Sequence, residues 1–149
     1  MSINPIQVPD SSGKKLNIHE GPRVIHLGQI EVRFLLENKD TDGRLAAFEF
    51  TVPAGVKVPA PHSHAHYDET IYGLAGVMTF TVNGRPTDLS PGEACFIPRG
   101  AVHGFNNLKP VPAKALAVAT PALIGRNISA TSPPLSIPAA RRTWRKSKR

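Results

Sequence analysis

The sequence predicts an all-β protein, either a sandwich or a barrel of short strands. Apolar segments alternate with turn signals roughly every eight to twelve residues, which is the spacing typical of such folds. No internal repeat and no helical pattern longer than two turns occurs. The chain has 149 residues, 40% of them hydrophobic, which allows one packed core but is too short for two ordinary domains.

Six segments carry the apolar pattern of strands, in the order Val32–Leu36, Leu45–Val52, Thr70–Leu74, Val77–Val82, Ala94–Ile97 and Ala113–Thr120. Glycine or proline interrupts the pattern in the loops expected at Lys39–Gly43, Pro53–Gly55 and Pro91–Gly92. Thr70–Leu74 and Val77–Val82 are predicted to pair tightly around Ala75-Gly76. Asn83-Gly84 is the strongest hairpin signal, because both residues tolerate a positive φ.

The two ends are expected to lie outside the barrel. Residues 1–15 are polar, and a short N-terminal arm over residues 1–20 is expected to precede a barrel domain over residues 21–125. Residues 126–149 begin Ser/Pro-rich and end basic, which predicts an irregular, disordered linker and tail. Six of the 18 basic residues lie after residue 140, whereas all 11 acidic residues lie before it. The barrel is therefore nearly neutral, which argues against specific nucleic-acid binding and leaves only non-specific anion binding by the tail.

Two features of the composition bear on location. No stretch approaches the roughly 18 apolar residues of a membrane span, and residues 1–15 lack the apolar run of a secretion signal. The one cysteine, Cys95, has no partner for an internal disulfide and is expected to be a buried thiol in the apolar run Ala94–Ile97. The sequence thus predicts a cytoplasmic protein with no membrane partner.

Three histidines and a glutamate are the residues most suited to chemistry. His62 and His64 are two positions apart, so in an extended strand both side chains face the same side. Glu69 follows where the next strand is expected to begin, and His103 lies in a distant segment. Three neutral imidazoles and one carboxylate suit a divalent first-row metal, and four protein ligands leave one or two coordination positions open.

Two motifs contain these residues. The first reads G-x6-H-x-H-x4-E-x6-G and comprises Gly55, His62, His64, Glu69 and Gly76. The second reads G-x5-P-x-G-x2-H-x3-N and comprises Gly92, Pro98, Gly100, His103 and Asn107. With these motifs the chain resembles the cupin superfamily, in particular its small single-domain members of the cupin 2 conserved barrel type that are quercetin dioxygenase-like. The one departure is that six residues, not five, separate Gly55 from His62.

The resemblance implies a double-stranded β-helix, or jelly-roll, barrel that holds one divalent transition metal per chain, either Fe, Mn, Ni, Cu or Zn. The implied metal ligands are His62, His64, Glu69 and His103. Quercetinase-like cupins use the glutamate both on the metal and detached from it as a general base, so Glu69 is the expected catalytic residue. The resemblance also implies a homodimer that exchanges N-terminal segments, here residues 1–20.

Four further side chains are candidates for the pocket or for the layer around the ligands, namely His66, Tyr67, Tyr72 and Phe105. By strand alternation His66 can share the side of His62 and His64, and it can then replace a ligand or carry protons. The alternative for His66 is a solvent-exposed or core position. The tyrosines can donate hydrogen bonds in the cavity or lie in the core or at its rim, and Phe105 can wall the pocket or fill the core.

Three functions fit such a site. The first is a quercetinase-like dioxygenase that binds a small oxygenated organic substrate at the open positions of the metal. The second is a redox-free, metal-dependent lyase or isomerase, in which the metal acts only as a Lewis acid. The third is a non-enzymatic protein that binds a small molecule. The fold itself does not choose among them, because the reaction depends on the site.

Overall fold

The structure is a computed structural model that describes residues 23–58 and 61–123. Within these ranges lie ten β-strands and one 3-10 helix, Asn38–Asp40. The strands are β1 (Arg23–Leu27), β2 (Ile30–Leu36), β3 (Ala46–Val52), β4 (Val56–Lys57), β5 (Asp68–Ala75), β6 (Met78–Val82), β7 (Arg85–Leu89), β8 (Ala94–Ile97), β9 (His103–Asn107) and β10 (Ala113–Thr120). In this part of the chain no helix has the length and apolar character needed to span a membrane.

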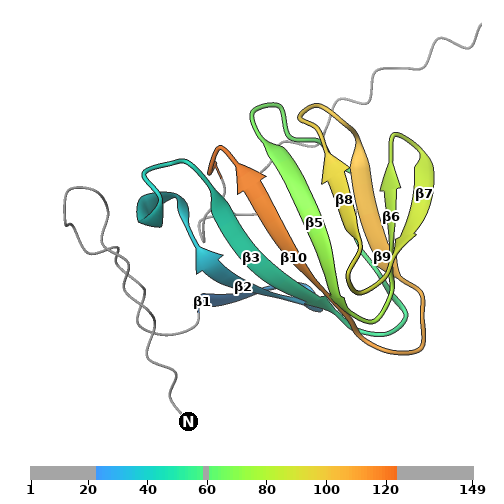
Figure 1. Ribbon diagram of the computed structural model, residues 1–149. Coiled ribbons are helices and arrows are strands. Elements are labelled where there is room, and N and C mark those ends of the chain that lie inside the picture. Colours follow the sequence, from blue (N-terminus) through green and yellow to red (C-terminus); the bar gives the residue numbers. More distant parts are fainter. Residues whose placement is uncertain (1–22, 59–60, 124–149) are drawn as a thin grey trace, which may run out of the picture.

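The strands form two antiparallel sheets. The larger sheet has the order β1-β2-β3-β10-β5-β8 and the smaller has the order β4-β9-β6-β7. In Figure 1 the larger sheet extends from the left of the view to its centre, and β9, β6 and β7 lie to the right. The chain passes from one sheet to the other after β3, β4, β5, β7, β8 and β9, as in a double-stranded β-helix. The predicted all-β, jelly-roll fold is therefore confirmed.

The six predicted strands coincide with β2, β3, β5, β6, β8 and β10 to within two residues at each end. The predicted hairpin at Asn83-Gly84 joins β6 to β7, with φ angles of 48° and 78° at its two residues. The predicted pairing around Ala75-Gly76 is wrong, because β5 pairs with β10 and β8 while β6 pairs with β7 and β9. A tight turn with a positive-φ glycine serves a hairpin and a corner between sheets equally well, and here it makes the corner.

The core lies between the inner faces of the two sheets. Burial alternates along the central strand β10, and its four inner positions are all alanine, namely Ala113, Ala115, Ala117 and Ala119. The small alanines leave space that larger side chains fill, since Phe50, Phe80 and Phe105 pack together with ring centroids 5.0–6.5 Å apart. Cys95 packs against this core, and burial raises the pKa of its thiol, as expected for an unreactive cysteine.

Asn107, the last residue of the second motif, ties three segments together at the end of β9. Its side chain is fully buried, and its amide nitrogen donates to the carbonyl oxygens of Val52, Pro53 and Val111 at 3.0, 3.1 and 2.8 Å. Its side-chain oxygen accepts a hydrogen bond from the backbone N–H of Lys109 at 3.1 Å. Asn107 therefore holds the chain in place after β3 and after β9, and its role is structural.

Asn107→Asp is expected to lower the free energy of unfolding by about 3–5 kcal/mol, because a buried carboxylate would face carbonyl oxygens to which it cannot donate. Urea denaturation measures this loss. Asn106→Asp is the matched control, since Asn106 uses its side-chain oxygen to accept from the backbone N–H of Val58, and a carboxylate keeps that bond. The control is expected to lose less than about 1 kcal/mol. Equal losses in the two variants would contradict the role given to the Asn107 amide.

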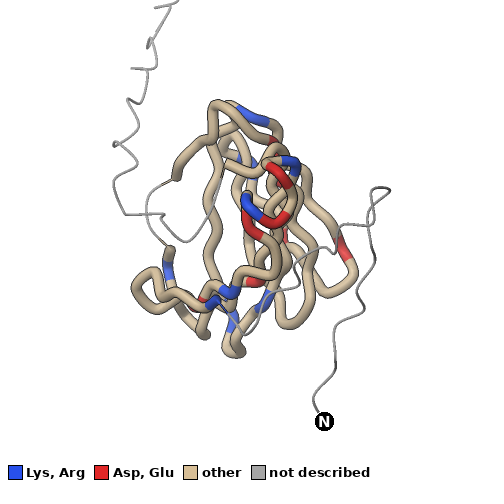
Figure 2. Tube along the Cα trace, turned by 90° about the vertical axis from the view of Figure 1, so that its left-hand side faces the viewer, with Lys and Arg blue, Asp and Glu red and all other residues tan. Residues whose placement is uncertain are grey.

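The predicted arm (1–20) and the predicted linker and tail (126–149) lie outside the described residues, whose strands run from Arg23 to Thr120. The described residues carry nine basic and nine acidic side chains, so the net charge of +7 belongs to the remainder of the chain. Figure 2 shows the two signs interspersed along the described part of the tube. This balance agrees with the nearly neutral barrel that the sequence predicts.

Candidate metal centre

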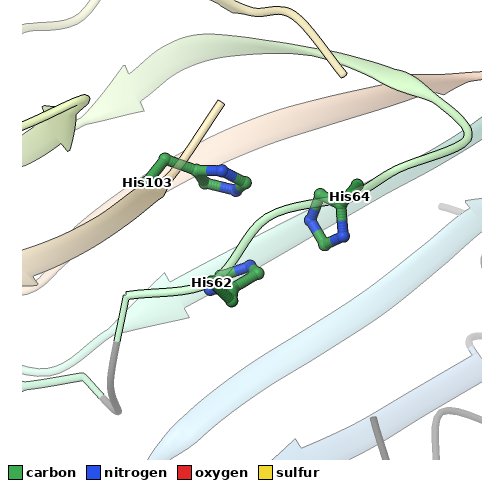
Figure 3. Close-up of side chains that lie close together, drawn as sticks. All are labelled: His62, His64 and His103. Carbon is green, nitrogen blue, oxygen red and sulfur yellow. The ribbon is translucent and has the colours of Figure 1, made fainter. Parts of the chain in front are cut away.

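Three imidazole rings from two distant segments meet inside the barrel (Figure 3). One ring nitrogen from each of His62, His64 and His103 lies within 4.8 Å of the others. The ring centroids are 4.8 Å apart for His62 and His64, 4.4 Å for His62 and His103, and 5.0 Å for His64 and His103. Ring nitrogens that share one ion at about 2.1 Å each lie no more than about 4.2 Å apart, so small ring rotations from this arrangement would place the three donors around one metal ion.

Backbone hydrogen bonds bring the two histidine segments together. The N–H of His62 donates to the carbonyl of His103 at 2.8 Å, and the N–H of His103 donates to the carbonyl of His62 at 2.7 Å. This pairing of His62 is an isolated bridge, and His64 lies in the irregular segment before β5. The expectation that both residues lie in one regular strand is therefore wrong. Their side chains still converge, because the bridge anchors His62 and the carbonyl of His64 accepts from the N–H of Gly100 at 2.7 Å.

Glu69 joins the three histidines from the start of β5. It lies on the buried face of that strand and is 8% exposed. Its Oε2 lies 3.4 Å from Nε2 of His103 and 3.7 Å from Nε2 of His64. The structure thus brings together all four side chains that the sequence singles out as ligands, with the carboxylate next to two of the three rings.

The surroundings of His103 set its tautomer. The ring is 3% exposed, and its Nδ1 lies 3.1 Å from the carbonyl oxygen of Ala101, which is an acceptor only. Nδ1 therefore carries the hydrogen in this bond, and in the neutral ring Nε2 keeps its lone pair. Since Nε2 is the atom that faces Glu69, the lone pair points toward the centre of the group. A backbone carbonyl that orients a ligating histidine is a common feature of metal sites.

The electrostatics of the group favour neutral imidazole at His64. Burial lowers the pKa of His64 to about 4, and the neighbouring rings of His62 and His103 add to this effect against the opposing influence of Glu69. His64 is therefore neutral at pH 7. Burial alone would lower the pKa of His103 as well, but the Glu69 carboxylate and the Ala101 carbonyl outweigh it and raise that pKa. Glu69 thus favours the charged form of the His103 ring, whereas burial keeps the His64 ring neutral.

Two of the predicted pocket residues lie near the ligands. The ring of Tyr67 stacks on the ring of His64 with centroids 4.2 Å apart and planes inclined by 20°, and Tyr67 is 9% exposed. Burial, together with the charge of Glu69, raises the pKa of Tyr67, so its hydroxyl keeps its proton at neutral pH. Phe105 lies two residues beyond His103 on β9 and packs against Phe50 and Phe80, so it fills the core beside the site.

The other two predicted pocket residues lie away from the ligands. Tyr72 is 43% exposed, because on β5 it alternates with the buried residues Glu69 and Ile71 and so lies on the outer face of the sheet. The expectation that Tyr72 enters the cavity is wrong. His66 is exposed and lies in a bend, so strand alternation does not carry it to the side of His62 and His64. Of the alternatives that the sequence leaves for His66, namely a place beside the ligands, a core position and a solvent-exposed position, the structure shows the solvent-exposed one.

Sequence reasoning missed the contact between Asp68 and Arg99. The two residues are 31 positions apart, and their side chains form an ion pair of 2.7 Å. The available signal was their place in the two motifs, since Asp68 directly precedes Glu69 and Arg99 lies between Pro98 and Gly100. Spacing along the chain does not reveal that these two positions meet.

Comparison with known proteins supports the family that the motifs indicate. Residues 48–119 match the cupin domain family Cupin_2. An uncharacterized protein from Aquifex aeolicus (strain VF5) is 34% identical over 67 residues, which are 45% of this chain, and the chain spans only 54% of that relative.

Two solved structures are similar over most of their own length. A predicted oxalate decarboxylase from Thermotoga maritima is 26% identical, with a TM-score of 0.60, over 66% of this chain and 90% of that one. KdgF from Halomonas sp. is 23% identical, with a TM-score of 0.58, over 66% of this chain and 84% of that one. The match over residues 48–119 and these structural likenesses support the cupin superfamily, and the described residues have the double-stranded β-helix fold.

Proposed function

We propose that this protein binds one divalent transition metal per chain, either Fe, Mn, Ni, Cu or Zn, through His62, His64, His103 and Glu69. The observation that carries the proposal is the convergence of three imidazole nitrogens within 4.8 Å of one another. A carboxylate oxygen at 3.4 and 3.7 Å from two of the rings completes a borderline donor set suited to these metals. Such a metal supplies Lewis acidity and, if it is redox-active, electron transfer to O₂.

Glu69 has the position required of a general base. Its carboxylate lies on the inner face of β5 beside the imidazoles, and it is almost fully buried. A substrate hydroxyl that entered beside His64 and His103 would meet this carboxylate within hydrogen-bonding reach. Tyr67 covers one face of the His64 ring and so restricts how that ring can turn.

The more specific proposal is a quercetinase-like dioxygenase that acts on a small oxygenated organic substrate. Its support is the two cupin motifs and the donor set of three histidines and one glutamate, which match that group of proteins. A dioxygenase of this type puts both atoms of O₂ into the products of one substrate, which itself supplies all four electrons, so one O₂ is consumed per substrate molecule. The test is metal analysis of the purified protein, followed by O₂ uptake with flavonols and β-diketones. If protein loaded in turn with each of the five metals consumes no O₂, this proposal fails.

Glu69→Gln is expected to reduce turnover at least about 100-fold while the protein still binds metal, because the amide oxygen can coordinate weakly but cannot accept the proton of the substrate. The O₂ uptake rate and the metal content of the same sample are measured together. Glu93→Gln serves as the control, since the Glu93 carboxylate is exposed and accepts from the N–H of Ser90. A Glu69→Gln protein that holds metal and turns over at the wild-type rate would remove Glu69 from the catalytic step.

One comparison favours a second candidate. The Thermotoga maritima protein that shares 26% identity is named a predicted oxalate decarboxylase, so a redox-free lyase acting on a small carboxylic acid is the alternative use of the same site. The two candidates differ in their need for O₂ as a substrate. Release of CO₂ from small dicarboxylic acids without stoichiometric O₂ uptake supports the lyase, and binding without turnover supports a small-molecule-binding cupin. The homodimer and the cytoplasmic location remain predictions of the sequence.

A further inference from the structure

A bidentate ion pair joins Asp68, the residue before Glu69, to Arg99, the residue before Gly100. Nη2 of Arg99 donates to Oδ2 of Asp68 at 2.7 Å, and Nε of Arg99 donates to Oδ1 at 3.2 Å. The backbone N–H of Arg99 also donates to Oδ1 of Asp68, at 2.8 Å. Three hydrogen bonds thus fix one carboxylate against both the side chain and the backbone of a single residue, which is the most directional form of ion pair in proteins.

The pair joins the two motifs at the point where they carry the ligands. Asp68 is the first residue of β5 and is bonded covalently to Glu69. Arg99 lies in the turn between β8 and β9, and the next residue, Gly100, donates its N–H to the carbonyl of His64 at 2.7 Å. The residue after that, Ala101, provides the carbonyl that orients the His103 ring. One turn of the chain, held to Asp68, is therefore linked to Glu69, His64 and His103.

The same pair contributes little to global stability. The side chain of Arg99 is 53% exposed and that of Asp68 is 26% exposed, so solvent screens their attraction. Exposed ion pairs of this kind contribute between nothing and about 1 kcal/mol to folding. The pair is therefore well directed but contributes little to folding. Its main expected effect is on the placement of the three candidate ligands to which it is linked through the chain.

We propose that Asp68 and Arg99 are positioning residues that hold Glu69, His64 and His103 in the geometry of the metal site. The proposal rests on the proposed function, namely that these residues bind a metal. Replacing groups that orient ligands typically weakens metal binding about 10–100-fold, because the ligands must then be ordered when the metal arrives. The pair accordingly raises affinity for the metal and barely affects the stability of the metal-free fold.

Arg99→Met separates positioning from simple charge. Removing a positive charge near a cation site strengthens cation binding by Coulomb's law, whereas losing the positioning contacts weakens it. We expect Co²⁺ affinity, measured by titration of the metal-free full chain and followed by visible absorbance, to fall about tenfold or more. Arg99→Lys keeps the positive charge but cannot form the bidentate pair of a guanidinium. Its Co²⁺ affinity is expected to lie between those of Arg99→Met and the wild type. The melting temperature of the metal-free protein should hardly change.

Lys109→Met is the matched control, because Lys109 forms an exposed ion pair of 2.8 Å with Asp88 away from the ligands. It removes the same charge and is expected to leave Co²⁺ affinity unchanged. Asp68→Asn provides a second test from the other partner and is expected to weaken binding as Arg99→Met does. Wild-type affinity, or tighter binding, in Arg99→Met would overturn the positioning role while metal binding stands. A wild-type chain that binds no Co²⁺ would overturn the proposed metal site and this role with it.

Discussion

Replacing His103 by alanine is expected to weaken binding of a divalent transition metal at least about 100-fold. His103 is the most buried of the three histidines at 3% exposed, and the Ala101 carbonyl orients its ring so that Nε2 faces Glu69. Loss of a ligand that is already oriented costs more than loss of a residue that orients one, for which 10–100-fold is typical. The measurement is metal stoichiometry after dialysis against a weak chelator, together with the affinity for Co²⁺.

Two further variants distinguish ligand loss from damage to the fold. His64→Ala removes a ring whose side chain is 21% exposed, so it should weaken metal binding to a similar degree with less effect on the core. His66→Ala removes an exposed histidine from the same segment and should bind metal as the wild type does. If His66→Ala loses the metal and His103→Ala retains it, the proposed set of ligands is wrong.

The residues of the candidate site could be predicted from the sequence, but the way in which they come together could not. The four candidate ligands follow from residue type and motif spacing, and the structure brings their side chains together. The route by which they meet was not predictable, because a regular strand through His62 and His64 is replaced by one bridge to His103 and one bond from Gly100. Those contacts join positions about 40 residues apart in the chain, and spacing carries no information about them.

The fold prediction is also limited by contacts between residues that are distant in the chain. Strands with clear apolar patterns, such as β3 and β10, could be placed to within two residues. Strand β9 has the sequence His-Gly-Phe-Asn-Asn, and its inward positions His103 and Asn107 are polar because they serve the site and a buried hydrogen-bond network. Strand β7 is almost wholly exposed, so its pattern also lacks alternation. Which face Tyr72 occupies depends on the register of β5 with its neighbours, which the sequence does not state.

Gly76→Ala is expected to lower the free energy of unfolding by about 3–5 kcal/mol, among the largest stability effects expected for this chain. Gly76 has a φ of +64°, in the left-handed region that costs a residue with a Cβ about 1–2 kcal/mol. A Cβ at this position would also lie 2.4 Å from the carbonyl oxygen of Pro112 and 2.9 Å from Cα of Ala113. Both obstacles are backbone at the start of β10, which cannot move without disturbing its pairing with β3 and β5.

Gly84→Ala isolates the conformational part of that cost. Gly84 has a φ of +78°, and a Cβ there would meet no atom within 4 Å, so a loss of about 1–2 kcal/mol is expected. Urea denaturation of the metal-free proteins gives both values, and their difference measures the close approach of the β5–β6 corner to β10. Equal losses would mean that the corner does not pack as described. If Gly76→Ala is destabilised as expected but still binds metal stoichiometrically when folded, the last glycine of the first motif serves the packing of the two sheets, and the chemistry belongs to the ligands alone.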